Sequence, residues 1–181
     1  FAAQISIGKT LSEMGEIHQS FTALGNYFQG EGYRLLADVE STKGKRTALL
    51  AKASEQYSTA LAIDPSNISA TRGLARVNEV SDRPDKALSM FERAKGLLLE
   101  ELTSPHPADG SMQLSHELLR TTRHLVNCVL DIRSHNPLSK WHEESRSLQL
   151  LGYLAESENA HRDHMRRFAF RKRWAYIEWF M

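Results

Sequence analysis

Apolar residues recur every three or four positions over most of the chain, a spacing that places them along one face of an α-helix. The first such series predicts one long helix from residue 7 to residue 28, carrying Ile7, Leu11, Met14, Ile17, Phe21, Leu24 and Phe28. The same pattern predicts further helices over residues 47–63, 68–80, 84–102, 112–132 and 138–160. No segment alternates apolar and polar residues as a half-buried strand does. The sequence therefore predicts an all-α protein.

Proline and polar residues mark the breaks between these helices. Pro65 cannot continue a helix, and Ser66 or Asn67 can cap the helix that follows. Pro84 suits the first turn of a helix, where its missing N–H has no helical partner to lose. Residues 103–110 contain two prolines and end in a glycine, which predicts a loop.

Two neighbouring helices carry small and aromatic residues at matching positions. Each residue of one set is followed about 34 positions later by its counterpart; the pairs are Ala53 and Ala87, Tyr57 and Phe91, and Ala60 and Ala94. Residues 47–101 therefore resemble the tetratricopeptide repeat family. This resemblance implies a right-handed α-solenoid of antiparallel helix pairs, with about three hairpin units plus terminal helices.

The resemblance also implies how the repeats divide the chain. Residues 1–181 form a single helical domain, with repeats at 18–67 and 68–101. Residues 112–181 form degenerate hairpins and a basic, aromatic C-terminal helix.

Within the first repeat, Phe21, Leu24, Gly25 and Phe28 have the spacing of a first helix. Gly25 would allow the paired helix to approach closely, and Gly32 lies where such repeats turn. This register leaves roughly 16 residues too many before Ala53. We place them as an insertion near residues 33–46, with residues 33–40 as an extension of the first helix or an extra turn and a loop over 41–46.

Composition excludes few partners. The net charge of +1 gives no overall attraction to nucleic acid or membranes. Cys128 is the only cysteine, so an intrachain disulfide and a cysteine-based zinc site are excluded, and its apolar neighbours predict a buried thiol. The compartment stays open: cytoplasmic, periplasmic, or membrane-associated through a partner.

Three short patterns match catalytic or metal-binding motifs only in part. Gly8-Lys9-Thr10 ends like a phosphate-binding loop but follows no strand. His116 and His142 begin the zinc pattern H-E-x-x-H, but an arginine replaces each second histidine. His161 and His164 are flanked by arginines, which repel a metal cation. We predict a protein that is not an enzyme and that needs no metal or other cofactor.

The resemblance implies a partner-binding groove lined by the first helix of each repeat. Arg72 and Arg76 lie four residues apart, so both guanidinium groups project from one helix face and could fork onto carboxylates of an acidic segment. The alternative is a solvated face on which they pair with neighbouring acids. The positions that match the family's groove are Asn26, Gln29, Ser69, Arg72, Arg76 and Glu79.

The C-terminus interleaves basic and aromatic residues. It could cap the solenoid, dock to a subunit or touch a membrane surface, and nucleic acid is the least expected partner. The docking candidates are Phe168, Phe170, Arg171, Trp174, Tyr176 and Trp179. We expect a protein-interaction scaffold or assembly subunit. The alternative is a soluble regulatory or assembly module of a membrane-associated complex, such as a bacterial glycan polymerase or ligase, docked through this C-terminal helix.

Overall fold

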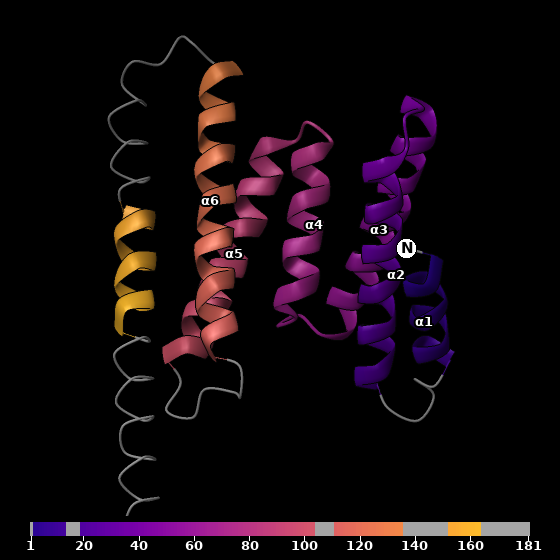
Figure 1. The fold of residues 1–181 in the computed structure, drawn as a ribbon, viewed down its shortest axis with the longest axis horizontal. Coiled ribbons are helices and arrows are strands. Elements are labelled where there is room, and N and C mark those ends of the chain that lie inside the picture. The colour runs from indigo at the N-terminus through magenta and orange to yellow at the C-terminus, as the bar shows by residue number, and fades with distance from the viewer. Residues whose placement is uncertain (1, 14–18, 104–110, 136–151, 164–181) are drawn as a thin grey trace, which may run out of the picture. The chain divides into compact units, whose positions relative to one another are not determined.

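A computed structural model describes residues 2–13, 19–103, 111–135 and 152–163 of the chain, and its regular elements there are all helices. They are α1 (Ala2–Glu13), α2 (Gln19–Val39), α3 (Lys43–Ile63), α4 (Ile68–Val80), α5 (Pro84–Thr103) and α6 (Ser111–His135), shown in Figure 1. A further helical segment covers residues 152–163. The prediction of an all-α protein is confirmed for the described residues, which contain no strand.

The chain divides into two compact units, Phe1–Ala94 and Lys95–Met181, with the boundary inside α5. In the first unit, α2 packs against α1, α3 and α4, and α3 also packs against α4. This unit contains the residues on which the functional argument depends.

The prediction of one helix from residue 7 to residue 28 is wrong, because α1 and α2 are separate helices that pack side by side. A Cβ atom added to Gly8 would lie only 2.6 Å from the carbonyl oxygen of Gly25. On one straight helix these two residues would be about 25 Å apart. The apolar spacing stays in phase across the junction, so periodicity alone could not reveal it. Gly25 does face a close helix, but that helix is α1.

The extra residues near 33–46 lengthen two helices. α2 runs without interruption through Gly32 to Val39, and α3 already begins at Lys43. The predicted extension of the first helix is confirmed and the turn at Gly32 is wrong, while the predicted loop over 41–46 is shorter than expected and covers residues 40–42. Lysine and arginine are good helix formers, so the polar run after residue 42 enters the first turn of α3.

The predicted breaks on either side of α4 are confirmed. The Asn67 side chain caps α4, with its Oδ1 accepting a hydrogen bond of 2.9 Å from the Ala70 backbone N–H. α4 has the predicted bounds, and α5 begins at Pro84 as expected and continues to Thr103. In this region the capping and proline signals agree with the apolar spacing.

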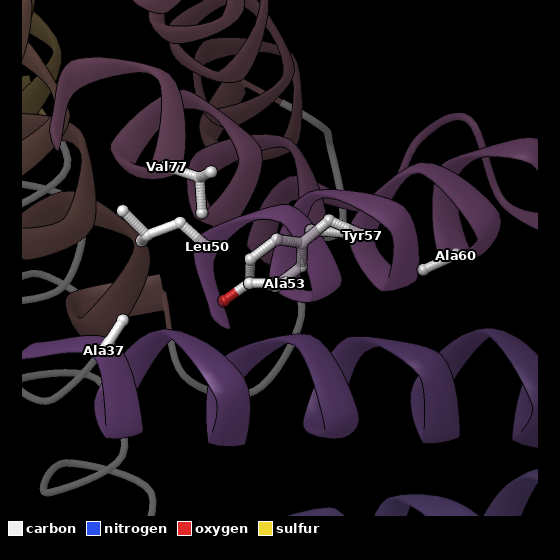
Figure 2. Close-up of a cluster of buried hydrophobic side chains, with 7 residues drawn as sticks. Ala37, Leu50, Ala53, Tyr57, Ala60 and Val77 are labelled. Carbon is white, nitrogen blue, oxygen red and sulfur yellow. The ribbon is translucent and has the colours of Figure 1, made fainter. Parts of the chain in front are cut away.

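Tyr57 of α3 fills a space that two glycines create between α2 and α4. A Cβ atom on Gly73 would lie 2.4 Å from Cζ of the Tyr57 ring, and one on Gly30 would lie 2.9 Å from the same ring. Figure 2 shows the ring within the cluster that also holds Leu50 and Val77, with its hydroxyl directed toward the helix that carries Ala37. Three helices therefore meet at one aromatic side chain.

All six residues that match at the repeat spacing are fully buried. They are the alanines and aromatics Ala53, Tyr57, Ala60, Ala87, Phe91 and Ala94. Small residues let helices approach closely, and one bulky ring per helix fills the space that remains.

We expect Gly73→Ala to destabilise the first unit by about 1–3 kcal/mol, because the new methyl group would overlap the confined Tyr57 ring. In an unobstructed helix the same exchange stabilises by up to about 1 kcal/mol. Gly96→Ala is the matched control, since no atom lies within 4 Å of a Cβ placed there. Urea denaturation of both variants checks this expectation. Equal midpoints would contradict the proposed contact.

The second unit buries apolar and polar side chains together. Leu118 and Leu125 of α6 are fully buried, and the hydroxyls of Thr122 and Ser157 lie 2.5 Å apart. Lys95 forms an ion pair with Glu156. Cys128 is buried, as its apolar neighbours predicted.

Candidate partner-binding face

Side chains of α2 and α4 meet beside the Tyr57 core. We call these residues the α2–α4 face: Tyr27, Glu31, Ser69, Arg72 and Arg76. The Tyr27 ring lies 6.2 Å from that of Tyr57, measured between centroids, and so connects the face to the core. The Ser69 hydroxyl and the charge of Arg72 both lower the pKa of the Tyr27 phenol. The charge of Arg76 lowers the pKa of the Glu31 carboxyl.

Glu31 joins the face to a partly buried ionic network. Its Oε2 accepts hydrogen bonds from the Tyr57 hydroxyl at 2.6 Å and from Arg34 Nε at 3.1 Å. A second nitrogen of the Arg34 guanidinium reaches the other oxygen of Glu31, and a third donates to Asp38 at 2.7 Å. The Arg34 guanidinium thus binds two carboxylates of its own helix, those of Glu31 and Asp38. Glu31 also accepts a hydrogen bond from Tyr57 and so links α2 to α3.

The sequence places this network along one face of α2. Glu31, Arg34 and Asp38 are three and four residues apart, so their side chains project from the same side of the helix. Tyr57 reaches them from α3 because glycines on either side leave room for its ring. The network therefore depends on the same close approach as the apolar core.

Burial and charge both shift the pKa values of these groups, and they act in opposite directions on Glu31 and Arg34. Burial alone would raise the pKa of the Glu31 carboxyl, but bonds from Arg34 and Tyr57 and the charges of Arg34 and Arg76 hold it below its ordinary value. Burial would lower the pKa of Arg34, yet Glu31 raises it. Burial, followed by the charge of Glu31, raises the pKa of Tyr57, which keeps its hydroxyl a hydrogen-bond donor. The network is charged and fully formed at neutral pH.

The pKa of the Tyr27 phenol is also raised. Burial is the main cause and the charge of Glu31 the next, while Ser69, Arg72 and Arg34 act in the opposite direction. Tyr27 is therefore a neutral, half-buried aromatic group. Its ring can offer apolar contact to a partner, and its hydroxyl can offer a directional hydrogen bond.

Arg72 and Arg76 are half-buried on α4, whereas Ser69 is exposed. Of the two interpretations given for these arginines, the structure supplies an acidic neighbour for Arg76 in Glu31, whose carboxylate already accepts from Arg34 and Tyr57. Arg72 also takes part in an interaction within the chain. Glu79 lies further along α4 and is half-buried. Both arginines therefore have neighbours within the chain and remain half-buried rather than enclosed.

The other two predicted groove residues have different surroundings. The Gln29 side chain is buried near α1, where its Nε2 donates to Ser12 Oγ at 3.2 Å. Asn26 is buried as well, with 8% of its surface exposed. That Asn26 and Gln29 line a partner groove stays a prediction.

Sequence reasoning missed Tyr27 and Glu31 as members of the face. Only positions that match the family's groove were considered on the first repeat. A signal was present, since Tyr27, Glu31 and Arg34 follow one another at helical spacing, but the turn predicted at Gly32 separated Arg34 from the other two. What the sequence could not show was that Tyr57 and Arg76 approach from two other helices.

The remaining candidates add no further chemistry to the described part of the chain. Gly8-Lys9-Thr10 lies within α1 rather than in a loop, and Gly8 is buried against α2. The rings of His116 and His161 lie 6.1 Å apart, and His161 contacts the buried Ser115 hydroxyl. The C-terminal docking candidates, from Phe168 to Trp179, lie outside the described residues.

The described residues contain no group of three or more histidine, cysteine, aspartate or glutamate side chains arranged to hold a metal ion. None of the helices there combines the length and the apolar character that a membrane crossing requires.

Comparison with known proteins gives no family to which this arrangement can be assigned. No family model matches the chain, no curated protein matches it, and no solved structure matches it. The functional argument therefore rests on the helices, the face and its charges.

Proposed function

We propose that this chain is a non-catalytic protein-interaction scaffold, built from helix pairs of the tetratricopeptide type, that binds a partner segment on its α2–α4 face. The full burial of the residues that recur at the repeat spacing supports the repeat interpretation. Stacked helix pairs need small and aromatic residues at such contacts, because each pair buries its apolar side against the next.

The observation that carries the proposal is the placement of Arg72 and Arg76. Both are half-buried and lie on one side of α4, where the charge of Arg72 lowers the pKa of Tyr27 and that of Arg76 lowers the pKa of Glu31, both on the neighbouring helix α2. Arginine and tyrosine dominate the energetics of many protein interfaces. A guanidinium fork matches the geometry of a carboxylate, so an acidic partner segment suits this face.

The partly buried ionic network gives the face its rigidity. Glu31 is bonded to Arg34 within α2 and to Tyr57 of α3, and Gly73 seats the same tyrosine against α4. A receptor that is already ordered loses little conformational entropy when its partner docks. Such a groove can accept an extended or helical segment without rearranging its own helices.

We expect the double variant Arg72→Gln/Arg76→Gln to bind its partner at least about tenfold more weakly than wild type. The partner is first identified by affinity purification with the wild-type chain, and its binding is then titrated against each variant. Glutamine keeps much of the side-chain length and avoids placing a new carboxylate beside Glu31.

Lys9→Gln/Lys45→Gln removes two exposed cations away from the face and serves as the control for net charge. Circular dichroism melting establishes that both double variants are folded. Unchanged affinity in a folded Arg72→Gln/Arg76→Gln chain would show that the partner binds elsewhere.

A further inference from the structure

Two adjoining pockets lie between α3, α4 and the start of α5, within the first unit. Their volumes are about 520 Å³ and about 450 Å³, and both are lined by Ser54, Asn78 and Arg83. They adjoin at these shared residues, and we call the two pockets together the α3–α5 groove. It uses none of the residues that define the α2–α4 face.

The larger pocket is cationic. Lys43 and Arg46 from the first turn of α3 line it together with Arg83, and Asp82 is its only carboxylate. Among the described residues, no ion pair neutralises any of these three cations. In the smaller pocket the positive charge of Lys86 and the negative charge of Asp85 offset each other. The groove therefore carries an excess of positive charge at one end.

The same pocket has an apolar floor. Leu50 and Val77 line it from the core, and Val80 remains 43% exposed at the end of α4. An exposed valine next to unpaired cations suits a ligand that brings both an apolar group and negative charge. A small inorganic anion would leave this apolar surface uncovered.

Polar groups extend along the rest of the groove. The smaller pocket is lined by Ser54 and Ser58 of α3, Asn78 of α4 and Ser89 of α5. Hydroxyl and amide groups of this kind can hydrogen-bond to the peptide groups of an extended chain. The groove spans three helices, which is more than a single charged group needs.

We propose that the α3–α5 groove binds an acidic segment of a partner protein, with an apolar side chain seated on Leu50, Val77 and Val80. Carboxylates flanking that side chain would reach Lys43, Arg46 and Arg83. The groove is a second binding site, and its argument does not depend on Arg72 or Arg76.

Asp82 forms part of the turn between α4 and α5, and its negative charge reduces the positive potential of the larger pocket. Its backbone has a φ of 56°, in the left-handed region that asparagine and aspartate adopt more readily than other side chains. Asp82→Asn therefore keeps the turn and removes the only carboxylate of the larger pocket. Asp82→Asn is therefore expected to raise the affinity, whereas the other groove variants are expected to lower it.

The probe is a fluorescein-labelled peptide of repeated Asp-Glu-Leu triplets, followed by fluorescence anisotropy with the full chain. We expect binding that weakens at least about tenfold in Arg46→Glu/Arg83→Glu and strengthens about threefold in Asp82→Asn. A peptide of Asn-Gln-Leu triplets tests the need for charge. Val80→Ser tests the apolar floor and is expected to weaken binding about threefold.

Lys9→Glu/Lys45→Glu is the matched control, because it reverses as many charges outside the groove and one of them lies in the same turn of α3. The inference is overturned if wild type does not bind the acidic peptide, or if this control weakens binding as much as Arg46→Glu/Arg83→Glu. It is also overturned if only Arg72→Gln/Arg76→Gln abolishes binding. That last result would leave the proposed function of the α2–α4 face intact.

Discussion

Tyr57→Ala should destabilise the first unit by about 3–5 kcal/mol, the largest effect of any single substitution we expect. The side chain is fully buried among α2, α3 and α4, and its removal leaves a cavity lined partly by glycine backbone. Helices with no side chain at these points cannot refill the space. Domains of this size have a total stability of about 5–15 kcal/mol. Chemical denaturation monitored by circular dichroism measures the loss.

Two other tyrosine variants separate the causes. Tyr57→Phe keeps the ring but removes the hydrogen bond to Glu31, and should cost about 1.5–3 kcal/mol. Tyr33→Ala removes a half-buried ring at the edge of the same core, so its cost should be clearly smaller. If Tyr57→Ala were no more harmful than Tyr33→Ala, Tyr57 would not join the three helices.

Glu31→Ala is expected to cost about 3 kcal/mol, because it leaves the Arg34 guanidinium buried with Asp38 as its remaining carboxylate partner. Arg34 is only 4% exposed and cannot recover the lost interaction from water. The substitution also leaves the Tyr57 hydroxyl without its acceptor. Equilibrium urea unfolding at neutral pH gives the magnitude.

The same variant should change the acid sensitivity of the protein. The pKa of Glu31 is lower in the folded chain than its ordinary value of 4.5, so its contribution is complete above that pH and is lost as the pH falls through the folded pKa. The stability difference between wild type and Glu31→Ala should therefore narrow below about pH 4.5. Glu55→Ala, on the exposed side of α3, is the control. A difference that stays constant with pH would contradict the network.

The part of the fold that could be predicted is the part where several local signals agree. Between residues 64 and 84 a proline, a capping asparagine and a second proline coincide with the apolar spacing, and the bounds of α4 follow from them. The residues recurring at the repeat spacing, on which the resemblance was based, are likewise all buried. Local chemistry decided these features.

Features that depend on contacts between helices could not be predicted. The junction of α1 and α2 leaves no trace in the apolar pattern, since both helices continue the same spacing. The contact of Gly8 with Gly25 becomes visible only once the helices are packed. The role of Glu31 required knowing that Tyr57 approaches it, from 26 positions further along the chain.

The candidate site shows the same division. Arg72 and Arg76 were found from their spacing on one helix, and the structure places them beside α2. The α3–α5 groove was not predicted, because Lys43 and Arg46 had been assigned to a loop. Once these residues form the first turn of α3, they lie with Arg83 around a single pocket.

The most direct test of the account is NMR chemical-shift mapping of the isotope-labelled chain while the captured partner segment is added. The account predicts that the largest shift changes fall on the α2–α4 face, at Tyr27, Ser69, Arg72 and Arg76. The buried contact between Tyr57 and Glu31 should persist unchanged, since the face is already formed. Changes that avoid this face, or that spread through the whole core, would contradict a rigid binding surface formed by α2 and α4.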